Sequence, residues 1–133
     1  MRRLSAALFF VVIFASCAFA QDFPVPSHWT NQHGSDMLLY TIDSKGAFTG
    51  AFINRAPGFA CDNVPYDLRG QVHGHHVKFA VVWKNAFQDC KAHTSWSGRV
   101  TGSTMTTWWV LTYLDGKGVT RKMRGSDTFK KQF

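Results

Sequence analysis

The sequence predicts an all-β protein, and more specifically an eight-stranded antiparallel up-and-down β-barrel. Apolar and polar residues alternate through a series of short segments, which is the period of a half-buried strand. Turn residues separate these segments at intervals of roughly 8–12 residues, and no segment carries a helical apolar period of useful length. Because an open sheet leaves its edge strands unpaired, closure into a barrel is the favoured arrangement of so many short strands.

Three of the first four expected strands end at a recognisable turn. A tryptophan opens the segment over residues 29–32, and residues 37–42 (MLLYTI) are rich in β-formers and stop at an Asp-Ser-Lys-Gly turn. Residues 47–55 alternate until Ala-Pro-Gly breaks them. Residues 66–72 follow and end at a His-Gly turn.

The last four expected strands follow this His-Gly turn. Residues 75–83 alternate up to a tryptophan, and residues 84–91 are then expected to form a polar loop. Residues 94–101 turn at a glycine into residues 103–113, and an Asp-Gly-Lys-Gly turn leads into residues 119–129.

Residues 1–20 have the pattern of a signal peptide. Two arginines precede an apolar run over residues 8–14, and the Ala-Phe-Ala at residues 18–20 fits a signal-peptidase site. We therefore expect an exported protein, periplasmic or secreted, with one mature domain over residues 21–133 and no membrane contact after cleavage. Lipid attachment at Cys17 is a weaker alternative, because phenylalanine opens its cleavage box.

The mature chain carries a net charge of +5, since cleavage removes two arginines and no acid. Its basic residues gather between Lys117 and Lys131. Such clustering can indicate nucleic-acid binding, but no nucleic-acid motif accompanies it. We expect an ordinary charged surface and no nucleic-acid partner.

Two cysteines remain after cleavage, and an even pair in an exported chain indicates a Cys61–Cys90 disulfide. By the loop-entropy model, closing a loop of this length stabilises the fold by about 3–4 kcal/mol. A metal site with two thiolates and a nearby histidine is the alternative, and an oxidising compartment disfavours it.

Tryptophans at Trp83, Trp96 and Trp109 lie within alternating segments. On strands that curl toward one another, their rings could wall a slot for a flat or aliphatic ligand, with a few polar groups at its end. The alternative is that the rings only fill a barrel core. On composition alone the two interpretations have similar weight.

Six short strings resemble those of the avidin/streptavidin family of biotin-binding barrels in order and spacing. They are WTNQHGS at residues 29–35, FTGAF at 48–52, VWKN at 82–85, TSWSG at 94–98, WVLT at 109–112 and DTF at 127–129. The resemblance spans nearly the whole mature chain. The positions of Cys61 and Cys90 resemble in particular the short, disulfide-bearing, rhizavidin-like dimeric avidins.

The resemblance implies biotin as the ligand and gives a role to each polar position. The ureido carbonyl oxygen needs donors, and Asn31 and Ser35 match two of the three that the family uses. The ureido N–H groups need acceptors, which Asp127 and Asn54 match, and Thr94 matches the hydroxyl that meets the thioether sulfur. Taken singly, Asn31 and Ser35 are more simply interpreted as turn residues, Asp127 as a loop or strand-end acid, and Asn54 as a strand-end residue. The walls match four apolar side chains: Trp83, Trp96, Trp109 and Leu111.

Two positions depart from the family pattern. Phe52 stands where the family has the tyrosine that supplies the third donor to the ureido oxygen, so the ring is kept and the hydroxyl is lost. A charge-assisted donor contributes about 1.5–3 kcal/mol, so its loss should weaken binding roughly ten- to a hundredfold. Ala92 replaces a serine that often meets the ligand carboxylate, and backbone N–H groups of residues 54–58 or a nearby cation could substitute.

A further departure concerns assembly. Tetrameric members lend a tryptophan to the neighbouring subunit's site, and residues 116–124 contain none. We expect a homodimer in which the disulfide stiffens the loops of the site.

Histidines offer two further candidates. His73, His75 and His76 cluster at a turn, but a metal site usually needs three or four converging ligands, so surface histidines are the favoured interpretation. His33 lies between Asn31 and Ser35, where the family commonly has an apolar residue near the ligand. It could contact the ligand or face the solvent at the rim, and a pH-dependent affinity would distinguish the two.

An enzyme is the main rival class. Ser35 with His33, or Cys90 with His93, could in principle form a nucleophile–base pair, but neither lies in a catalytic signature. We therefore expect no enzymatic activity and no cofactor. A lipocalin-like carrier of another small hydrophobic ligand is the alternative function, although the Gly-x-Trp opening and C-terminal helix of that fold are missing from the sequence.

Overall fold

The computed structural model describes residues 11–12 and 23–133, so most of the predicted signal peptide and the cleavage site lie outside the described residues. Within residues 23–133 the chain forms strands and turns. The strands are β1 (Ser27–Asn31), β2 (Asp36–Ile42), β3 (Ala47–Ile53), β4 (Pro65–His73), β5 (His76–Lys84), β6 (Asp89–Thr101), β7 (Thr104–Leu114) and β8 (Thr120–Lys131). No helix in the described part of the chain is long and apolar enough to cross a membrane.

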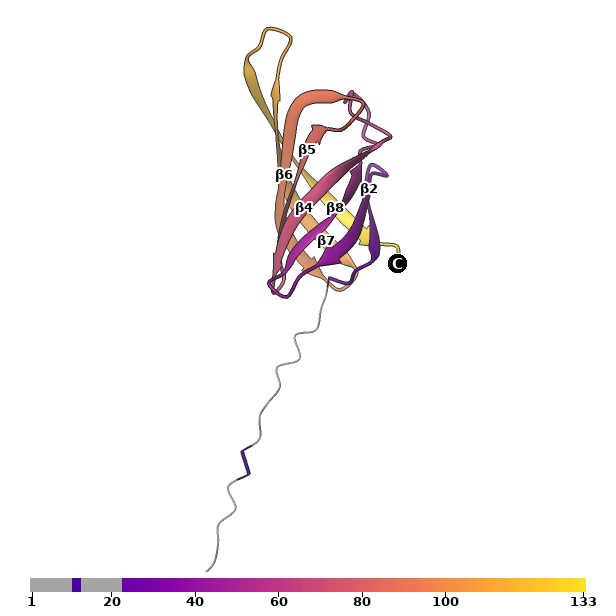
Figure 1. Ribbon diagram of the computed structural model, residues 1–133, viewed down its shortest axis with the longest axis vertical. Coiled ribbons are helices and arrows are strands. Elements are labelled where there is room, and N and C mark those ends of the chain that lie inside the picture. The colour runs from indigo at the N-terminus through magenta and orange to yellow at the C-terminus, as the bar shows by residue number, and fades with distance from the viewer. Residues whose placement is uncertain (1–10, 13–22) are drawn as a thin grey trace, which may run out of the picture.

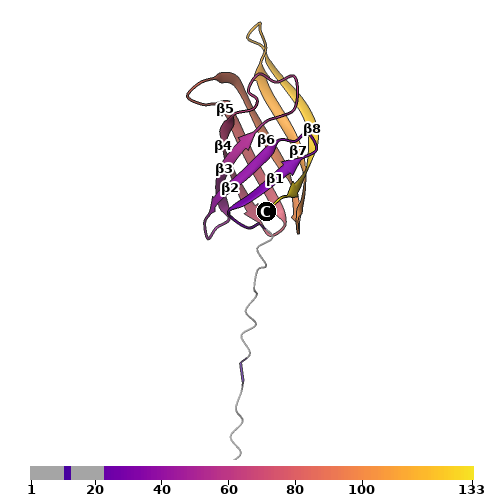
Figure 2. The same ribbon diagram turned by 90° about the vertical axis from the view of Figure 1, so that its right-hand side faces the viewer.

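The eight strands form one closed antiparallel barrel, which confirms the predicted fold class (Figures 1 and 2). Each strand pairs with the next along the chain, and β1 also pairs with β8, with Trp29 opposite Lys131 and Asn31 opposite Phe129. This last pairing removes both sheet edges. It also brings the beginning and the end of the domain together.

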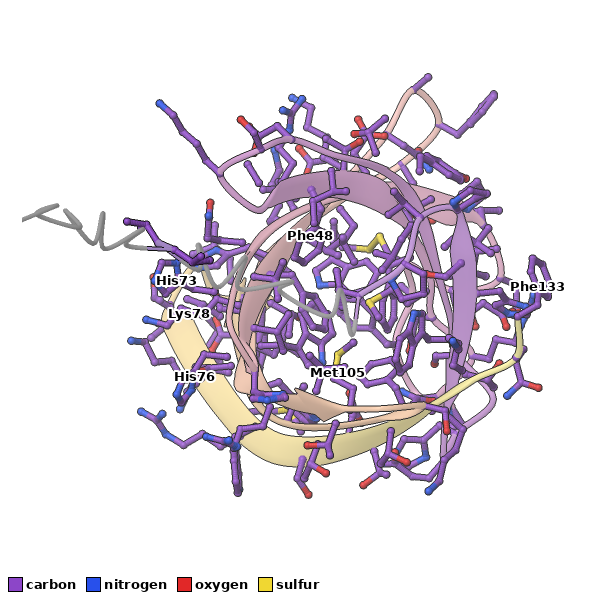
Figure 3. The ribbon with its side chains drawn as sticks, turned by 90° about the horizontal axis from the view of Figure 1, so that it is seen from below. Phe48, His73, His76, Lys78, Met105 and Phe133 are labelled. Atoms are coloured by element: carbon purple, nitrogen blue, oxygen red, sulfur yellow. A yellow bond between two sulfur atoms is a disulfide. The ribbon has the colours of Figure 1, made fainter. Side chains whose placement is uncertain are left out.

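Strict alternation along each strand separates the barrel interior from its surface. On β5 every second residue is buried, from Val77 through Phe79 and Val81 to Trp83. Seen along the barrel, Phe48 and Met105 point inward, whereas His76 and Lys78 lie outside the wall (Figure 3). Each fully buried large side chain stabilises the fold by roughly 1.5–3 kcal/mol relative to its exposed state.

The polar segment after Trp83 is shorter than predicted. β5 continues to Lys84 and β6 begins at Asp89, directly opposite it, so Cys90 lies in a strand and not in a loop. The predicted loop over residues 84–91 is therefore wrong at both ends. The tight turn forms because the Asn85 side-chain oxygen accepts the N–H groups of Phe87 and Gln88, both at 2.9 Å.

The β7–β8 hairpin projects beyond the end of the barrel (Figure 1). Its turn is organised by Asp115, whose Oδ1 accepts the N–H groups of Lys117 and Val119 at 2.9 Å each. Asp115 Oδ2 also accepts from Arg121 Nε at 2.9 Å. The wall formed by β7 and β8 thus extends past the rest of the barrel rim, and Asp115 orders its tip.

Candidate ligand-binding site

A cavity of about 200 Å³ opens at the barrel end from which this hairpin projects. Its lining comes from six of the eight strands or the loops that follow them: Asn31, His33, Phe52, Asn54, Ala56, Pro57, Gly58, Phe59, Trp83, Thr94, Trp96, Trp109, Leu111, Met123 and Asp127. Most of the sequence-predicted ligand residues are in this set. Carbon surface predominates in the lining, and the polar atoms belong to a few side chains, which is the usual composition of a small-ligand site.

The carboxylate of Asp127 on β8 lines the cavity, and this residue is only 5% exposed. Its Oδ2 accepts a hydrogen bond from the indole Nε1 of Trp96 at 2.8 Å, and its Oδ1 accepts from Gln32 Nε2 at 3.1 Å. Both carboxylate oxygens are thus held by donors from other parts of the barrel. A carboxylate can accept about four hydrogen bonds, so capacity remains for a ligand N–H.

Gln32 was not predicted as a site residue, and it fastens β8 to the β1–β2 turn. Besides Asp127, its side-chain Nε2 donates to the carbonyl oxygen of Ser126 at 2.9 Å, and its Oε1 accepts the N–H of Thr128 at 2.9 Å. The amide of Gln32 therefore acts on three consecutive residues of β8. The sequence carries no signal for this contact, because the partners lie 94 to 96 positions apart.

Asn31, at the end of β1, has its amide orientation fixed by the turn that follows. Its Oδ1 accepts the backbone N–H groups of His33 and Ser35, each at 3.0 Å. Because the oxygen is occupied by these two bonds, the NH₂ end is the one available to donate into the cavity. The turn thus fixes which end of the Asn31 amide faces the cavity, and that end is the NH₂ donor.

Ser35 and Asn54 lie side by side at the base of the β3–β4 loop. The Ser35 hydroxyl accepts the backbone N–H of Arg55 at 2.9 Å, and it lies 3.5 Å from Asn54 Oδ1, to which it donates. Asn54 Oδ1 also accepts the N–H of Ala56 at 3.2 Å. Ser35 is 1% exposed and does not line the cavity directly, whereas Asn54 does.

Two indole rings are fixed by packing and by their N–H groups. Trp96 lies between Phe52 and Phe79, with ring centroids 4.9 Å away on each side, and its N–H binds Asp127. Trp83 donates its N–H to the Thr94 hydroxyl at 2.8 Å. Because Thr94 accepts this bond, its own hydroxyl hydrogen is free to point at a ligand.

Tyr66 supports Trp83 from behind, with its ring edge-on to the indole at a centroid distance of 5.3 Å. Burial raises the pKa of Tyr66, and the charge of Asp62 adds to this effect. Tyr66 is therefore a neutral packing partner at physiological pH.

Trp109 forms the wall on the hairpin side, and its ring lies over Gly125 on β8. The two residues are paired across the strands, and a Cβ at Gly125 would meet three atoms of the indole ring. Two positions further along the hairpin, Leu111 is opposite Met123, and both line the cavity. Met123 was not predicted from the sequence.

The β3–β4 loop, residues 54–64, borders the cavity opening. Its residues Pro57, Gly58 and Phe59 line the cavity, and the Phe59 ring stands edge-on to Trp83 at 5.2 Å. The predicted disulfide is present and ties Cys61 in this loop to Cys90 on β6, with Cα atoms 6.2 Å apart. One covalent bond thus joins the loop to the wall formed by β6.

The remaining candidates lie at or beyond the edge of the site. His33 is exposed and borders the cavity opening. Ala92 is buried on the inward face of β6, two residues before Thr94 in the chain, but it does not line this cavity. Among the described residues, no group of three His, Cys, Asp or Glu side chains could hold a metal ion.

The geometry defines a class of protein, a closed antiparallel barrel that binds a small ligand at one end. A model of the avidin family matches residues 20–132. The chain belongs to the avidin family. No observation favours the lipocalin-like alternative.

Individual relatives agree with this assignment. Afifavidin from Afifella pfennigii is 39% identical, and the match covers 97% of this chain and 92% of afifavidin. The structure of a bradavidin2–biotin complex is 38% identical with a TM-score of 0.75, covering 83% of this chain and 99% of that one. A rhizavidin–biotin complex is 37% identical with a TM-score of 0.75, covering 81% and 92%.

Gly125→Ala should destabilise the protein by about 1–3 kcal/mol, because the added methyl group forces the Trp109 ring out of its position. Denaturant unfolding followed by tryptophan fluorescence measures this change. Gly116→Ala is the matched control, since a Cβ there meets nothing within 4 Å. Equal stability of the Gly125→Ala variant and the wild type would contradict the placement of Trp109.

Proposed function

We propose that this protein binds biotin tightly and non-covalently in the cavity at the barrel end, with one site per chain. The observation that carries the proposal is that defined donors and acceptors face one another in the cavity lining and, in the case of Ser35, directly behind it beside Asn54. The Asn31 NH₂ group and the Ser35 hydroxyl suit a carbonyl oxygen, and the Asp127 carboxylate and Asn54 Oδ1 suit the N–H groups that flank it. A carboxylate opposite the oxygen donors also polarises a urea and strengthens both sets of hydrogen bonds.

The walls suit the rest of the ligand. Trp83, Trp96, Trp109 and Leu111 would enclose the fused rings and the aliphatic chain. The free hydroxyl hydrogen of Thr94 would face the thioether sulfur. With Ala92 outside the lining, the carboxylate end would meet backbone N–H groups of residues 54–59 at the opening.

Binding of this kind requires no chemical step, so we infer that the protein is a binder and not an enzyme. The Cys90 thiol is consumed by the disulfide, which removes one of the two nucleophiles considered. The disulfide and the pattern of residues 1–20 support export to a periplasm or to the outside of the cell, with residues 21–133 as the mature domain.

Calorimetry of the oxidised protein with biotin should give one site per chain and tight binding. Asp127→Asn should weaken binding by about ten- to a hundredfold, because it removes the charged acceptor. Asp67→Asn changes an exposed carboxylate on the outer face of β4 and should leave the affinity unchanged. Absence of binding to the wild type would contradict the proposal.

Phe52→Tyr should tighten biotin binding by about ten- to a hundredfold, because it adds a donor for the ureido oxygen. Phe52 is 2% exposed and lines the cavity beside Trp96, as this role requires. Calorimetry or competition against a labelled biotin provides the measurement. An unchanged or weaker affinity would show that Phe52 does not face the ureido oxygen.

Reduction of Cys61–Cys90 should raise the biotin dissociation rate by roughly three- to tenfold, because a freed loop loses more entropy on binding. The rate is measured by chase of a fluorescent biotin after reduction has been verified by thiol titration. The Cys61→Ser/Cys90→Ser variant, which responds to no reductant, is the control. An unchanged rate in the reduced protein would contradict a stiffening role.

We further propose that two chains associate through the outer face of β5–β8. The most exposed large apolar side chains on this face are Trp108 at 64% and Val82 at 62% exposure. Their neighbours Ala80, Ser95 and Ser97 are small and exposed, so a flat surface could approach closely. Exposed apolar patches of this kind commonly mark protein–protein contacts.

Trp108→Lys should convert the dimer into a monomer at micromolar concentration, because it places a charge in the centre of that contact. Analytical ultracentrifugation measures the mass. Tyr40→Lys is the control, since Tyr40 is 55% exposed but lies on β2. A monomeric wild type, or a Trp108→Lys variant that remains dimeric, would exclude this interface.

A further inference from the structure

An ion pair just outside the cavity is connected to one of its proposed ligand-binding groups. Asp36 is the first residue of β2 and Arg55 follows the end of β3. Asp36 on β2 is directly opposite Ile53 on β3. Arg55 follows Ile53 by two positions, so it lies close to Asp36. The Arg55 Nε donates to Asp36 Oδ2 at 3.0 Å.

The Asp36 carboxylate is held on its other oxygen as well. His28 Nε2 lies 2.7 Å from Asp36 Oδ1, and the Thr30 hydroxyl donates to the same atom at 3.4 Å. Burial would raise the pKa of Asp36, but the hydrogen bonds and charges of His28 and Arg55 together lower it below its ordinary value. The Asp36 side chain is 18% exposed and remains ionised under physiological conditions.

The backbone N–H of Arg55 in turn donates a hydrogen bond to the Ser35 hydroxyl. The Arg55 N–H donates to Ser35 Oγ at 2.9 Å, at a point where β3 has already ended at Ile53. This N–H belongs to the peptide unit whose carbonyl, that of Asn54, accepts the Asn63 N–H at 2.8 Å, and the Arg55 side chain adds a second anchor. That side chain binds Asp36 and also donates to Asn63 Oδ1 at 3.3 Å.

A hydroxyl that accepts one hydrogen bond at a fixed position has a restricted choice for its own hydrogen. With Arg55 N–H on one side of Ser35 Oγ, its hydrogen is directed to Asn54 Oδ1 at the long distance of 3.5 Å. A bond this long is weak, so a better acceptor can replace it. A ligand carbonyl oxygen in the cavity would be such an acceptor.

We propose that Asp36 and Arg55 are positioning residues, which hold the Arg55 N–H against Ser35 Oγ and so orient the Ser35 hydroxyl toward the ligand carbonyl. The inference rests on the proposed binding of biotin. It adds two residues that do not line the cavity and were not predicted from the sequence. An isolated surface ion pair contributes little to stability, so the effect is expected on ligand dissociation more than on folding.

A double-mutant cycle on the biotin dissociation rate tests the inference. Asp36→Asn should raise the rate about three- to tenfold when Ser35 is present, and less than twofold in a Ser35→Ala background. Arg55→Gln should behave in the same way and keeps the inference testable if Asp36→Asn folds poorly. In the unliganded protein, Asp36→Asn should also accelerate hydrogen exchange of the Arg55 amide.

The Asp115–Arg121 pair is the matched control, because it also joins an arginine Nε to an aspartate Oδ2, at 2.9 Å, but it lies in the β7–β8 hairpin. Any effect of Asp115→Asn should be equal with and without Ser35. If Asp36→Asn and Arg55→Gln raise the rate equally in both backgrounds, or not at all, the positioning role is excluded although biotin binds. If the wild type itself retains no biotin, the proposed function fails and this inference fails with it.

Discussion

The pairing of β1 with β8 is the constraint on which the rest of the structure depends. It joins Asn31 to Phe129 in register, and it thereby places the donor at the end of β1 close to the acceptor Asp127 on β8. Gln32 then fastens the two ends together through Ser126, Asp127 and Thr128. Without closure these groups would lie on opposite edges of a sheet, and the polar end of the cavity would not exist.

Closure also allows the polar groups to be held before any ligand arrives. Trp96 and Gln32 hold the carboxylate of Asp127, and two backbone N–H groups hold the amide of Asn31. Trp83 similarly holds the hydroxyl of Thr94. Each group keeps one free donor or acceptor while its orientation is fixed. Tight binding is expected of such a site, because little conformational entropy remains to be lost.

Much of this could be predicted from the sequence, because it depends on local pattern. Alternation predicts the strands, an even number of cysteines in an exported chain predicts the Cys61–Cys90 bond, and Trp83, Trp96 and Trp109 mark the walls. The parts that were missed depend on contacts between distant positions. In the sequence Gln32 looks like an ordinary turn residue, and only the folded structure brings β8 beside it. The ion pair of Asp36 with Arg55 likewise depends on the register of β2 and β3. The loop expected over residues 84–91 was too long for the same reason, since Lys84 pairs with Asp89 across a short hairpin.

The central claim is that a urea group is held between amide and hydroxyl donors on one side and a single buried carboxylate on the other. A crystal structure of the oxidised protein with biotin tests it most directly. The account predicts the ureido oxygen at hydrogen-bond distance from Asn31 Nδ2 and Ser35 Oγ, and a ureido nitrogen at that distance from Asp127. An empty cavity, or biotin bound with its ureido group turned away from Asp127, would contradict it.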